Sequence, residues 1–424
     1  MNTEPSSEMF APNVASSSLI PVSVARDGFT LAQAAELRAR YTFEEGFDAG
    51  DVTLYEFLHA SEIFLTAMIP RSGNVEMFEA APDTTIGAIS YASSAGEMTL
   101  DEYLVHPESR AQAMIVVHQG RVLYEQYPGM RDHDYHFWMS CAKPTTSIVL
   151  AQLEAEGALD VRQPVGAYIP ELRGTAWEHI IVLDVLDMAS GLDLEENAVT
   201  RADPTTVAFR LNKAEAGEPN HTGHTETMLE LIQSAPTLRE PGQVLEYSSV
   251  NTQVLVLLAE AIENRRWPEI FRERVWSKLT GEGDATVSVT PDGAAIAHGL
   301  ISTRLRDLAR FGMLYTPSWN KAAREPAVPA QHLEHIRHGG RPEIYGRGSF
   351  GKRMQGSFAG DVPIANSRQW DAVFTDGDFF KSGLMGQGLY VSPDRDLVMA
   401  WFSTCPATDL THYGRILATR FAAR

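Results

Sequence analysis

Ser140 and Lys143 most constrain this chain, because they place a hydroxyl and an amine one helical turn apart. They lie where a strand-rich stretch gives way to a helical pattern. Positions i and i+3 of a helix share a face, so we expect the two groups within hydrogen-bonding reach. A serine hydroxyl is a weak nucleophile until a base takes its proton. A lysine can be that base only when burial or nearby positive charge lowers its pKa. The chain has only six lysines and none precedes Lys143, so this spacing is not a by-product of a lysine-rich sequence.

The composition is that of a globular protein whose negative charge disfavours binding to anionic partners. The 424 residues are 44% hydrophobic and 21% charged, and can bury one large core or two intertwined ones. A formal charge of −20 argues against nucleic acid and against an anionic membrane surface as partners. We therefore expect a small-molecule partner, and a homodimer is left open.

Cysteine usage and the first residues favour a cytoplasmic location. The two cysteines, Cys141 and Cys405, make no disulfide framework, and both fall in segments predicted as core. Free thiols in a reducing compartment fit this pattern. The N-terminus lacks a basic region followed by a continuous apolar stretch, so we expect no secretory signal. The longest apolar runs, such as Val254–Ala259, fall far short of the roughly 20 residues of a membrane helix.

Strand patterns occur at both ends of the chain around a helical middle. Residues 113–125 and 388–403 each read as a β-hairpin, and a short helix is predicted after residue 410. This order predicts an α/β (α+β) fold with one antiparallel sheet flanked by terminal helices and an inserted helical domain. We expect a loose segment over residues 1–26, a sheet domain from residues 27–160 and 300–424, and a mainly helical domain over 161–299.

Two further motifs could complete a site with Ser140. Tyr247 precedes a helix, and a tyrosine beside a lysine ammonium can have a lowered pKa and relay protons. Lys381, Ser382 and Gly383 open the last hairpin, where we expect an edge strand whose backbone N–H groups can stabilise an oxyanion. His332, His335 and His338 are spaced like metal ligands, but we interpret them as a helix C-terminus, where histidine is favoured. We predict neither a metal nor a cofactor.

The order of the Ser-x-x-Lys, tyrosine and Lys-Ser-Gly motifs resembles the serine β-lactamase and penicillin-binding-protein superfamily. The finer resemblance is to its class C-like branch, which includes family VIII carboxylesterases and 6-aminohexanoate-dimer hydrolases. It spans roughly residues 111–424, and its stretches are 139–143, 165–172, 185–188, 246–252, 303–312 and 386–394.

The resemblance implies a role for each matching residue. Ser140 would attack the acyl carbon, Lys143 would take its proton, and Tyr247 would carry protons to the leaving group and to water. The backbone N–H groups of Ser140 and Leu384 would hold the oxyanion. The implied substrate-binding residues are Asn251, His298, Lys381, Ser382 and Gly383, with Lys381 either contributing charge or only occupying the register.

These motifs predict a serine hydrolase that cleaves a carboxylic ester or a small linear amide through an acyl-enzyme. Ser249 stands where the β-lactamase motif has asparagine, which weakens the case for β-lactam recognition. A β-lactamase, a peptidase acting on D-residues and a non-catalytic penicillin-recognition-like binding protein are the alternatives.

Overall fold

The core of the protein is an eight-stranded sheet built from both ends of the chain. The computed structural model describes residues 18–423. The strands lie in the order β10-β11-β12-β13-β14-β5-β6-β2. Their bounds are β10 (Ala365–Ser367), β11 (Trp370–Val373), β12 (Phe379–Gly383), β13 (Gln387–Ser392), β14 (Leu397–Ser403), β5 (Ala111–His118), β6 (Arg121–Gln126) and β2 (Glu79–Ala80). The two predicted hairpins are therefore β5–β6 and β13–β14, and β14 joins them by pairing with β5. The predicted fold class is confirmed, with one correction: β2 pairs parallel with β6, so the sheet is mixed at that edge.

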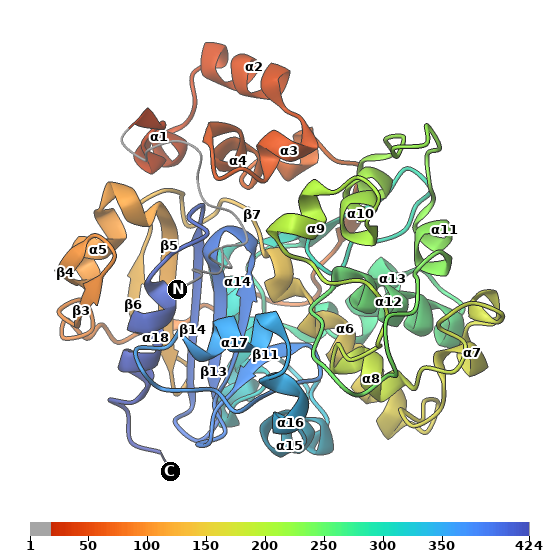
Figure 1. Ribbon diagram of the computed structural model, residues 1–424. Helices are drawn as coiled ribbons and strands as arrows, with labels where there is room; N and C mark the ends of the chain where they lie inside the picture. Colours follow the sequence, from red (N-terminus) through yellow and green to blue (C-terminus); the bar gives the residue numbers. More distant parts are fainter. Residues whose placement is uncertain (1–17, 424) are drawn as a thin grey trace, which may run out of the picture.

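The two faces of this sheet bury alternate side chains against different helices. On one face Met399 and Trp401 pack with α18 (Leu410–Ala418) and α5 (Leu100–Val105). On the other face Val398 packs with α14 (Leu305–Met313), which comes so close that a Cβ on Gly312 would lie 2.7 Å from Val398 Cγ1. Figure 1 shows α18 in front of the strands and α14 behind them. Only α18 matches the expected terminal covering helices, because the N-terminal helices α1 and α2 make their main contacts with α4.

A second, four-stranded sheet was not predicted. Its order is β1-β8-β9-β7, and a separate hairpin is formed by β3 and β4. The bounds are β1 (Thr66–Ile69), β8 (Ala285–Ser288), β9 (Ile301–Thr303), β7 (His136–Phe137), β3 (Ser90–Ser93) and β4 (Gly96–Thr99). β7 matters for function because it ends three residues before Ser140.

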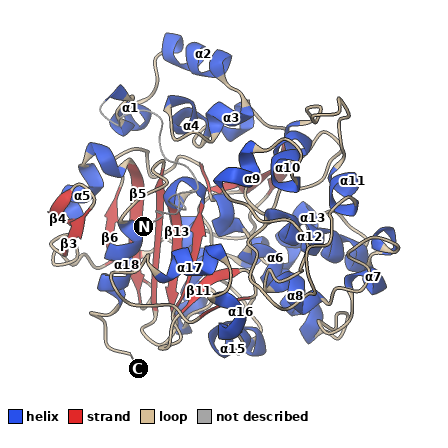
Figure 2. Cartoon of the chain, viewed as in Figure 1, coloured by secondary structure: helices blue, strands red, loops and turns tan. Residues whose placement is uncertain are grey.

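Helices fill the middle of the chain and cover its start. Figure 2 shows the strands of the large sheet at the left and centre, helices α6 to α13 at the right, and helices α1 to α4 at the top. The remaining helices are α1 (Val22–Asp27), α2 (Leu31–Arg40), α3 (Phe43–Gly46), α4 (Asp51–Glu56), α6 (Pro144–Ala155), α7 (Val165–Tyr168), α8 (Val182–Leu186), α9 (Ala198–Ala202), α10 (Val207–Ala216), α11 (Met228–Gln233), α12 (Ser249–Glu263), α13 (Trp267–Arg274), α15 (Ala330–His338), α16 (Pro342–Tyr345) and α17 (Ser349–Gln355). Residues 161–299 are mainly helical, although β8 lies among them, and the division into two domains stays a prediction.

The predicted loose segment is only partly described. Residues 1–17 lie outside the described residues, and Val22–Asp27 forms α1 rather than a loose chain. Two arginine side chains anchor the segment around α1 by hydrogen bonds. Arg110 donates to the Ile20 carbonyl at 3.2 Å, and Arg131 donates to the Arg26 carbonyl at 2.8 Å. No helix among residues 18–423 combines the length and apolar character needed to cross a bilayer.

Candidate active site

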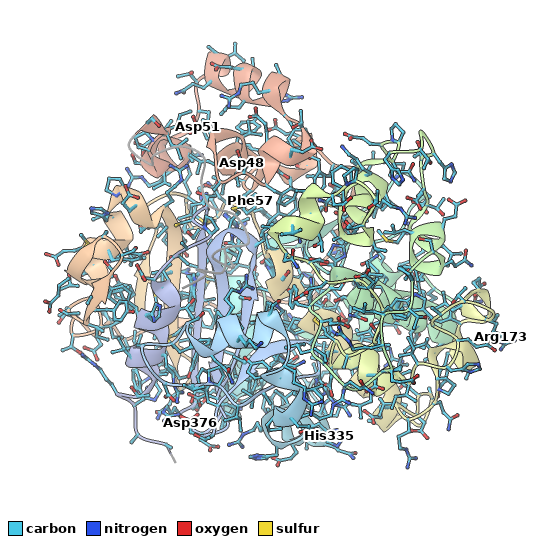
Figure 3. The ribbon with its side chains drawn as sticks, in the orientation of Figure 1. Asp48, Asp51, Phe57, Arg173, His335 and Asp376 are labelled. Carbon is cyan, nitrogen blue, oxygen red and sulfur yellow. The ribbon has the colours of Figure 1, made fainter. Side chains whose placement is uncertain are left out.

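Ser140 lies in a tight turn, and backbone hydrogen bonds fix the two residues that lead into it. The backbone N–H of Phe137 donates to the Phe57 carbonyl, and that of Trp138 donates to the Ile301 carbonyl at 2.8 Å. Phe57 lies just below α3 and α4, where the N-terminal helices meet the sheet (Figure 3). Met139 then adopts a left-handed backbone with φ of 48°, a strained conformation for a side chain of this kind. Two backbone hydrogen bonds to distant segments therefore fix the chain just before Ser140.

Ser140 lies in a 3₁₀ turn over Met139–Ala142, and Lys143 caps the helix that follows it, α6. We expected both residues on one α-helix. In a 3₁₀ turn the side chains at i and i+3 eclipse each other, which brings them still closer. The distance from Lys143 Nζ to Ser140 Oγ is 3.0 Å, so the expected hydrogen bond is present.

Lys143 is fully buried and meets three oxygen atoms. Besides Ser140, its Nζ donates to Ser249 Oγ at 2.9 Å and to the His298 carbonyl at 3.0 Å. Burial is the main cause that lowers the pKa of Lys143 to about 7, and the charge of Lys381 lowers it further, while Glu196 opposes the shift. Near neutral pH a large fraction of this amine is uncharged and can accept the Ser140 proton.

Glu196 is a site residue that sequence reasoning missed. Its carboxylate accepts a hydrogen bond from Ser249 Oγ at 3.2 Å and another from the Ser249 backbone N–H. Arg201 pairs with it at 2.6 Å. Burial alone would raise the pKa of Glu196, but Arg201 and Lys143 together hold it below its ordinary value. A negative charge is thus connected to the amine of Lys143 through one hydroxyl.

The phenol of Tyr247 is buried between the two lysines of the site. Lys381 Nζ lies 3.2 Å from its oxygen, and Lys143 Nζ lies 5.3 Å from its ring centre. Burial raises the pKa of Tyr247 well above its ordinary value, and the charge of Asp371 adds to the effect, whereas a hydrogen bond from Ser140 opposes it. The expectation of a lowered pKa is therefore wrong, because desolvation outweighs the neighbouring ammonium groups. Tyr247 is protonated at neutral pH and can donate a proton.

Lys381 forms a buried ion pair rather than a solvated strand edge. Its Nζ lies 2.6 Å from Asp371, which also accepts hydrogen bonds from the Ser382 backbone N–H at 2.9 Å and from the Ser382 hydroxyl. Burial lowers the pKa of Lys381, and Asp371 opposes that shift. Strand β12 is interior to the sheet, which corrects the edge-strand expectation. Its register with β11 includes only Phe379 and Phe380, so its last three residues pair with β13 alone.

The end of β12 lies directly beside the segment that carries Ser140. A Cβ on Gly383 would lie 2.7 Å from the Trp138 carbonyl, so only glycine permits this approach. Leu384 follows as the first residue of a 3₁₀ turn, where its backbone N–H has no partner within that turn. Ser140, Ser382, Gly383 and Leu384 all line one cavity. Ser140 and Leu384 therefore border the same cavity, and the role of their backbone N–H groups in holding an oxyanion stays a prediction.

Three of the five predicted substrate-binding residues, Asn251, His298 and Lys381, do not line that cavity. Asn251 is fully buried on α12 and does not line the cavity wall. The imidazole of His298 is engaged elsewhere, 2.8 Å from Glu215 and 3.0 Å from Gln253 Oε1, and only its carbonyl reaches the site, at Lys143. The predicted contact of these side chains with a substrate therefore finds no support in the cavity lining.

The cavity has a volume of about 510 Å³ and combines apolar and cationic walls. Tyr247 and Phe350 stack in its wall with ring centres 4.1 Å apart. Its lining also includes Arg201, Arg353, Met354, Phe380, Met385 and Pro406. This volume suits a small organic substrate.

The remaining polar candidates lie away from this centre. His332 is buried on α15 with Nε2 at 3.4 Å from Ser147 Oγ, and His335 lies near the lower edge of the molecule in Figure 3. Residues 18–423 contain no cluster of three or more His, Cys, Asp or Glu side chains arranged to hold a metal ion. Cys141 is buried as expected and lies 3.2 Å from the Lys381 carbonyl, but Cys405 is only half-buried.

A mixed sheet covered by helices, a buried lysine hydrogen-bonded to a serine of the cavity wall, and a nearby phenol define a hydrolase of the β-lactamase fold. The chain belongs to the Beta-lactamase family, whose model matches residues 102–423. It is 28% identical over 390 residues to a 6-aminohexanoate-dimer hydrolase from Paenarthrobacter ureafaciens, covering 88% of this chain and 93% of that protein.

Solved structures share the fold. A protein from Bacillus anthracis, assigned provisionally as a 6-aminohexanoate-dimer hydrolase, has a TM-score of 0.75 at 20% identity and covers 90% of this chain and 97% of its own. EstCE1, a hydrolase with promiscuous acyltransferase activity, has a TM-score of 0.53 at 15% identity and covers 73% of this chain and 92% of its own. The predicted membership of the β-lactamase superfamily is confirmed, and the similarity to a 6-aminohexanoate-dimer hydrolase agrees with the predicted branch.

Proposed function

We propose that this protein hydrolyses a small linear amide or a carboxylic ester through an acyl-enzyme on Ser140. The observation that carries the proposal is the position of Lys143 Nζ, which is fully buried and lies 3.0 Å from the hydroxyl of Ser140 in the cavity wall. Neutral Lys143 accepts the Ser140 proton as Oγ bonds to the carbonyl carbon. The N–H groups of Ser140 and Leu384 stabilise the resulting oxyanion, and one such donor is typically worth about 3 kcal/mol of the barrier.

Collapse of that intermediate needs an acid, and Tyr247 fits the role. As the bond from the carbonyl carbon to nitrogen or oxygen breaks, the phenol gives its proton to the leaving group, and the Lys143 ammonium returns a proton to the phenolate. In the second half Lys143 takes a proton from water, the hydroxide oxygen bonds to the acyl carbon, and Ser140 leaves with the proton held by Lys143. A protonated phenol is most useful for an amide, because the departing nitrogen must be protonated before it leaves.

An amide substrate is also favoured by the relative from Paenarthrobacter, whose name identifies it as acting on the 6-aminohexanoate dimer. We therefore place linear amides of short ω-functional chains first and simple esters second. Esters should be turned over in either case, since their leaving groups need less assistance. The protein would carry out this reaction in the cytoplasm.

The test is hydrolysis of p-nitrophenyl esters and of the 6-aminohexanoate dimer by the purified protein and by Ser140→Ala. Loss of at least 10³-fold in kcat with an unchanged melting temperature is expected, as for removal of a nucleophile. The matched control is Ser234→Ala, an exposed serine that does not line the cavity. Retention of most activity in Ser140→Ala would refute the mechanism.

Two alternatives are separated by labelling and by a chromogenic β-lactam. A β-lactamase is suggested by the family itself, but Ser249 binds Lys143 and Glu196 and leaves no amide at that position for a β-lactam. We expect nitrocefin turnover to be slow or absent, and rapid turnover would reverse the assignment. A non-catalytic binding protein would fail to react with a fluorophosphonate probe, whereas we expect stoichiometric labelling of Ser140.

A further inference from the structure

Arg353 is a cation in the cavity wall that the proposed chemistry does not use. Helix α17 presents it into the same cavity as Ser140. Within residues 18–423 its guanidinium forms no ion pair and donates no side-chain hydrogen bond; its contact is a stack on the Phe350 ring at 4.8 Å. The other arginine of the cavity, Arg201, is already paired with Glu196.

An unpaired, half-buried guanidinium is costly unless a ligand neutralises it. Burial lowers the pKa of Arg353, and Asp371 is the main group that opposes this shift. The carboxylate of Asp371 is itself occupied by Lys381 and Ser382. Asp409, which also lines the cavity, accepts the backbone N–H and hydroxyl of Ser94 at 2.8 and 2.7 Å. Each carboxylate near Arg353 therefore has other partners, and the guanidinium is left for a ligand.

The stacking geometry sets where a ligand anion would bind. Arg353 and Tyr247 both contact the Phe350 ring, at 4.8 Å from the guanidinium carbon to the ring centre and at 4.1 Å between the two ring centres. A group bound by Arg353 would thus lie in the same cavity as the reacting phenol and beside this aromatic pair. The cavity wall also includes Met354, Phe380 and Met385, which are apolar and suit a chain of methylene groups.

We propose that Arg353 binds a carboxylate at the end of an aliphatic chain of the substrate, away from the bond that is cleaved. This inference rests on the proposed hydrolase function and names the substrate class for it. The planar fork of a guanidinium matches a carboxylate in a bidentate manner. The carboxylate could belong to the acyl part or to the leaving part, and both present the same chemistry to Arg353.

Paired substrates test the proposal. The first arm compares p-nitrophenyl esters of ω-carboxyalkanoic acids of four to eight carbons with esters of the uncharged alkanoic acids of equal length, which places the charge in the acyl part. The second arm compares N-acyl-6-aminohexanoate with its methyl ester, which places the charge in the leaving part. The readout is the ratio of kcat/KM between charged and uncharged members, for the wild type, Arg353→Met, Arg353→Lys and the control Lys352→Met. Lys352 is the exposed neighbour on α17 and lies outside the cavity lining.

We expect a preference for the charged member in one arm. That ratio should fall at least tenfold in Arg353→Met, less in Arg353→Lys, and not in Lys352→Met. The arm that responds identifies the part of the substrate that carries the carboxylate. Ratios unaffected by Arg353→Met in both arms would overturn the inference, while activity lost in Ser140→Ala would still support the hydrolase.

A binding measurement keeps the two proposals distinguishable if neither substrate is cleaved. Titration of adipate monomethyl ester into Ser140→Ala and into Ser140→Ala/Arg353→Met reports the carboxylate contact without catalysis. A tenfold larger dissociation constant in the double variant would support the role of Arg353 even if the proposed hydrolase function proved wrong. Equal dissociation constants would refute it.

Discussion

The pKa of Lys143 should set the acidic limb of the pH–rate profile, and Glu196 should control where that limb lies. Lys143 must be uncharged to accept the Ser140 proton, and its pKa is about 7. Activity should therefore rise with pH through about 7 and level off above it. Glu196 opposes the lowering of the pKa of Lys143, so Glu196→Gln should lower it further and move the limb to lower pH.

The size of the shift follows from the hydrogen-bond chain through Ser249. Its two hydrogen bonds, of 2.9 and 3.2 Å, place the ammonium no more than about 6 Å from the carboxylate. At an effective dielectric constant of about 20, two unit charges at that distance interact by roughly 3 kcal/mol. This corresponds to roughly 2 pKa units, since one unit equals ~1.4 kcal/mol. We expect Glu196→Gln to lower the pKa of Lys143 by roughly 1–2 units, because protein relaxation and water reduce the full charge–charge interaction.

The assay is kcat/KM for a p-nitrophenyl ester between about pH 5 and pH 9, which reports groups of the free enzyme. The matched control is Glu195→Gln, the adjacent carboxylate, which contacts Ser349 instead of Ser249. Melting temperatures show whether Glu196→Gln remains folded. A limb that stays in place, or that moves to higher pH, would refute Lys143 as the base.

Three stability predictions follow from buried groups outside the reaction itself. Burial raises the pKa of Glu56, whose carboxylate has no hydrogen-bond partner among residues 18–423, so the native protein holds a proton that the unfolded chain releases. The unfolding free energy should then fall by ~1.4 kcal/mol per pH unit from about pH 4.3 upward until the native pKa is reached, and Glu56→Gln should remove this decline. Lys381→Met should cost about 3–5 kcal/mol, because it leaves Asp371 buried without its partner. Gly388→Ala should cost about 1–3 kcal/mol, because the new Cβ would lie 2.1 Å from the Trp401 indole.

Urea denaturation measures all three, with exposed or open positions as controls. Glu36→Gln should leave the pH dependence of stability unchanged, and parallel curves for Glu56→Gln and wild type would contradict the buried-proton account. Lys321→Met removes an exposed lysine, so a cost equal to that of Lys381→Met would contradict the ion-pair argument. Gly299→Ala, with no heavy atom within 4 Å of the added Cβ, should have a smaller effect than Gly388→Ala.

The parts of the fold that the sequence predicted are those with strong local patterns. The hairpins of β5–β6 and β13–β14 and helix α18 have the alternation or periodicity of their class, and each was placed correctly. Strands β1, β8, β9 and β7 were missed because they are two to four residues long and lie far apart in the chain. The position of β7 is fixed by hydrogen bonds of Phe137 and Trp138 to distant carbonyl groups, which no local pattern reveals.

The candidate site divides in the same way. Ser140, Lys143 and Tyr247 could be found because motif spacing identifies them, and the structure brings all three together. Glu196 and Arg353 could not, because their surroundings form only on folding. Glu196 contacts a serine 53 residues away, and the guanidinium of Arg353 stacks on Phe350 but forms no ion pair with any of residues 18–423. The predicted direction of the pKa shift of Tyr247 was wrong for a related reason. Proximity to a lysine can be expected from a motif, but the depth of burial that outweighs it is a property of the assembled core.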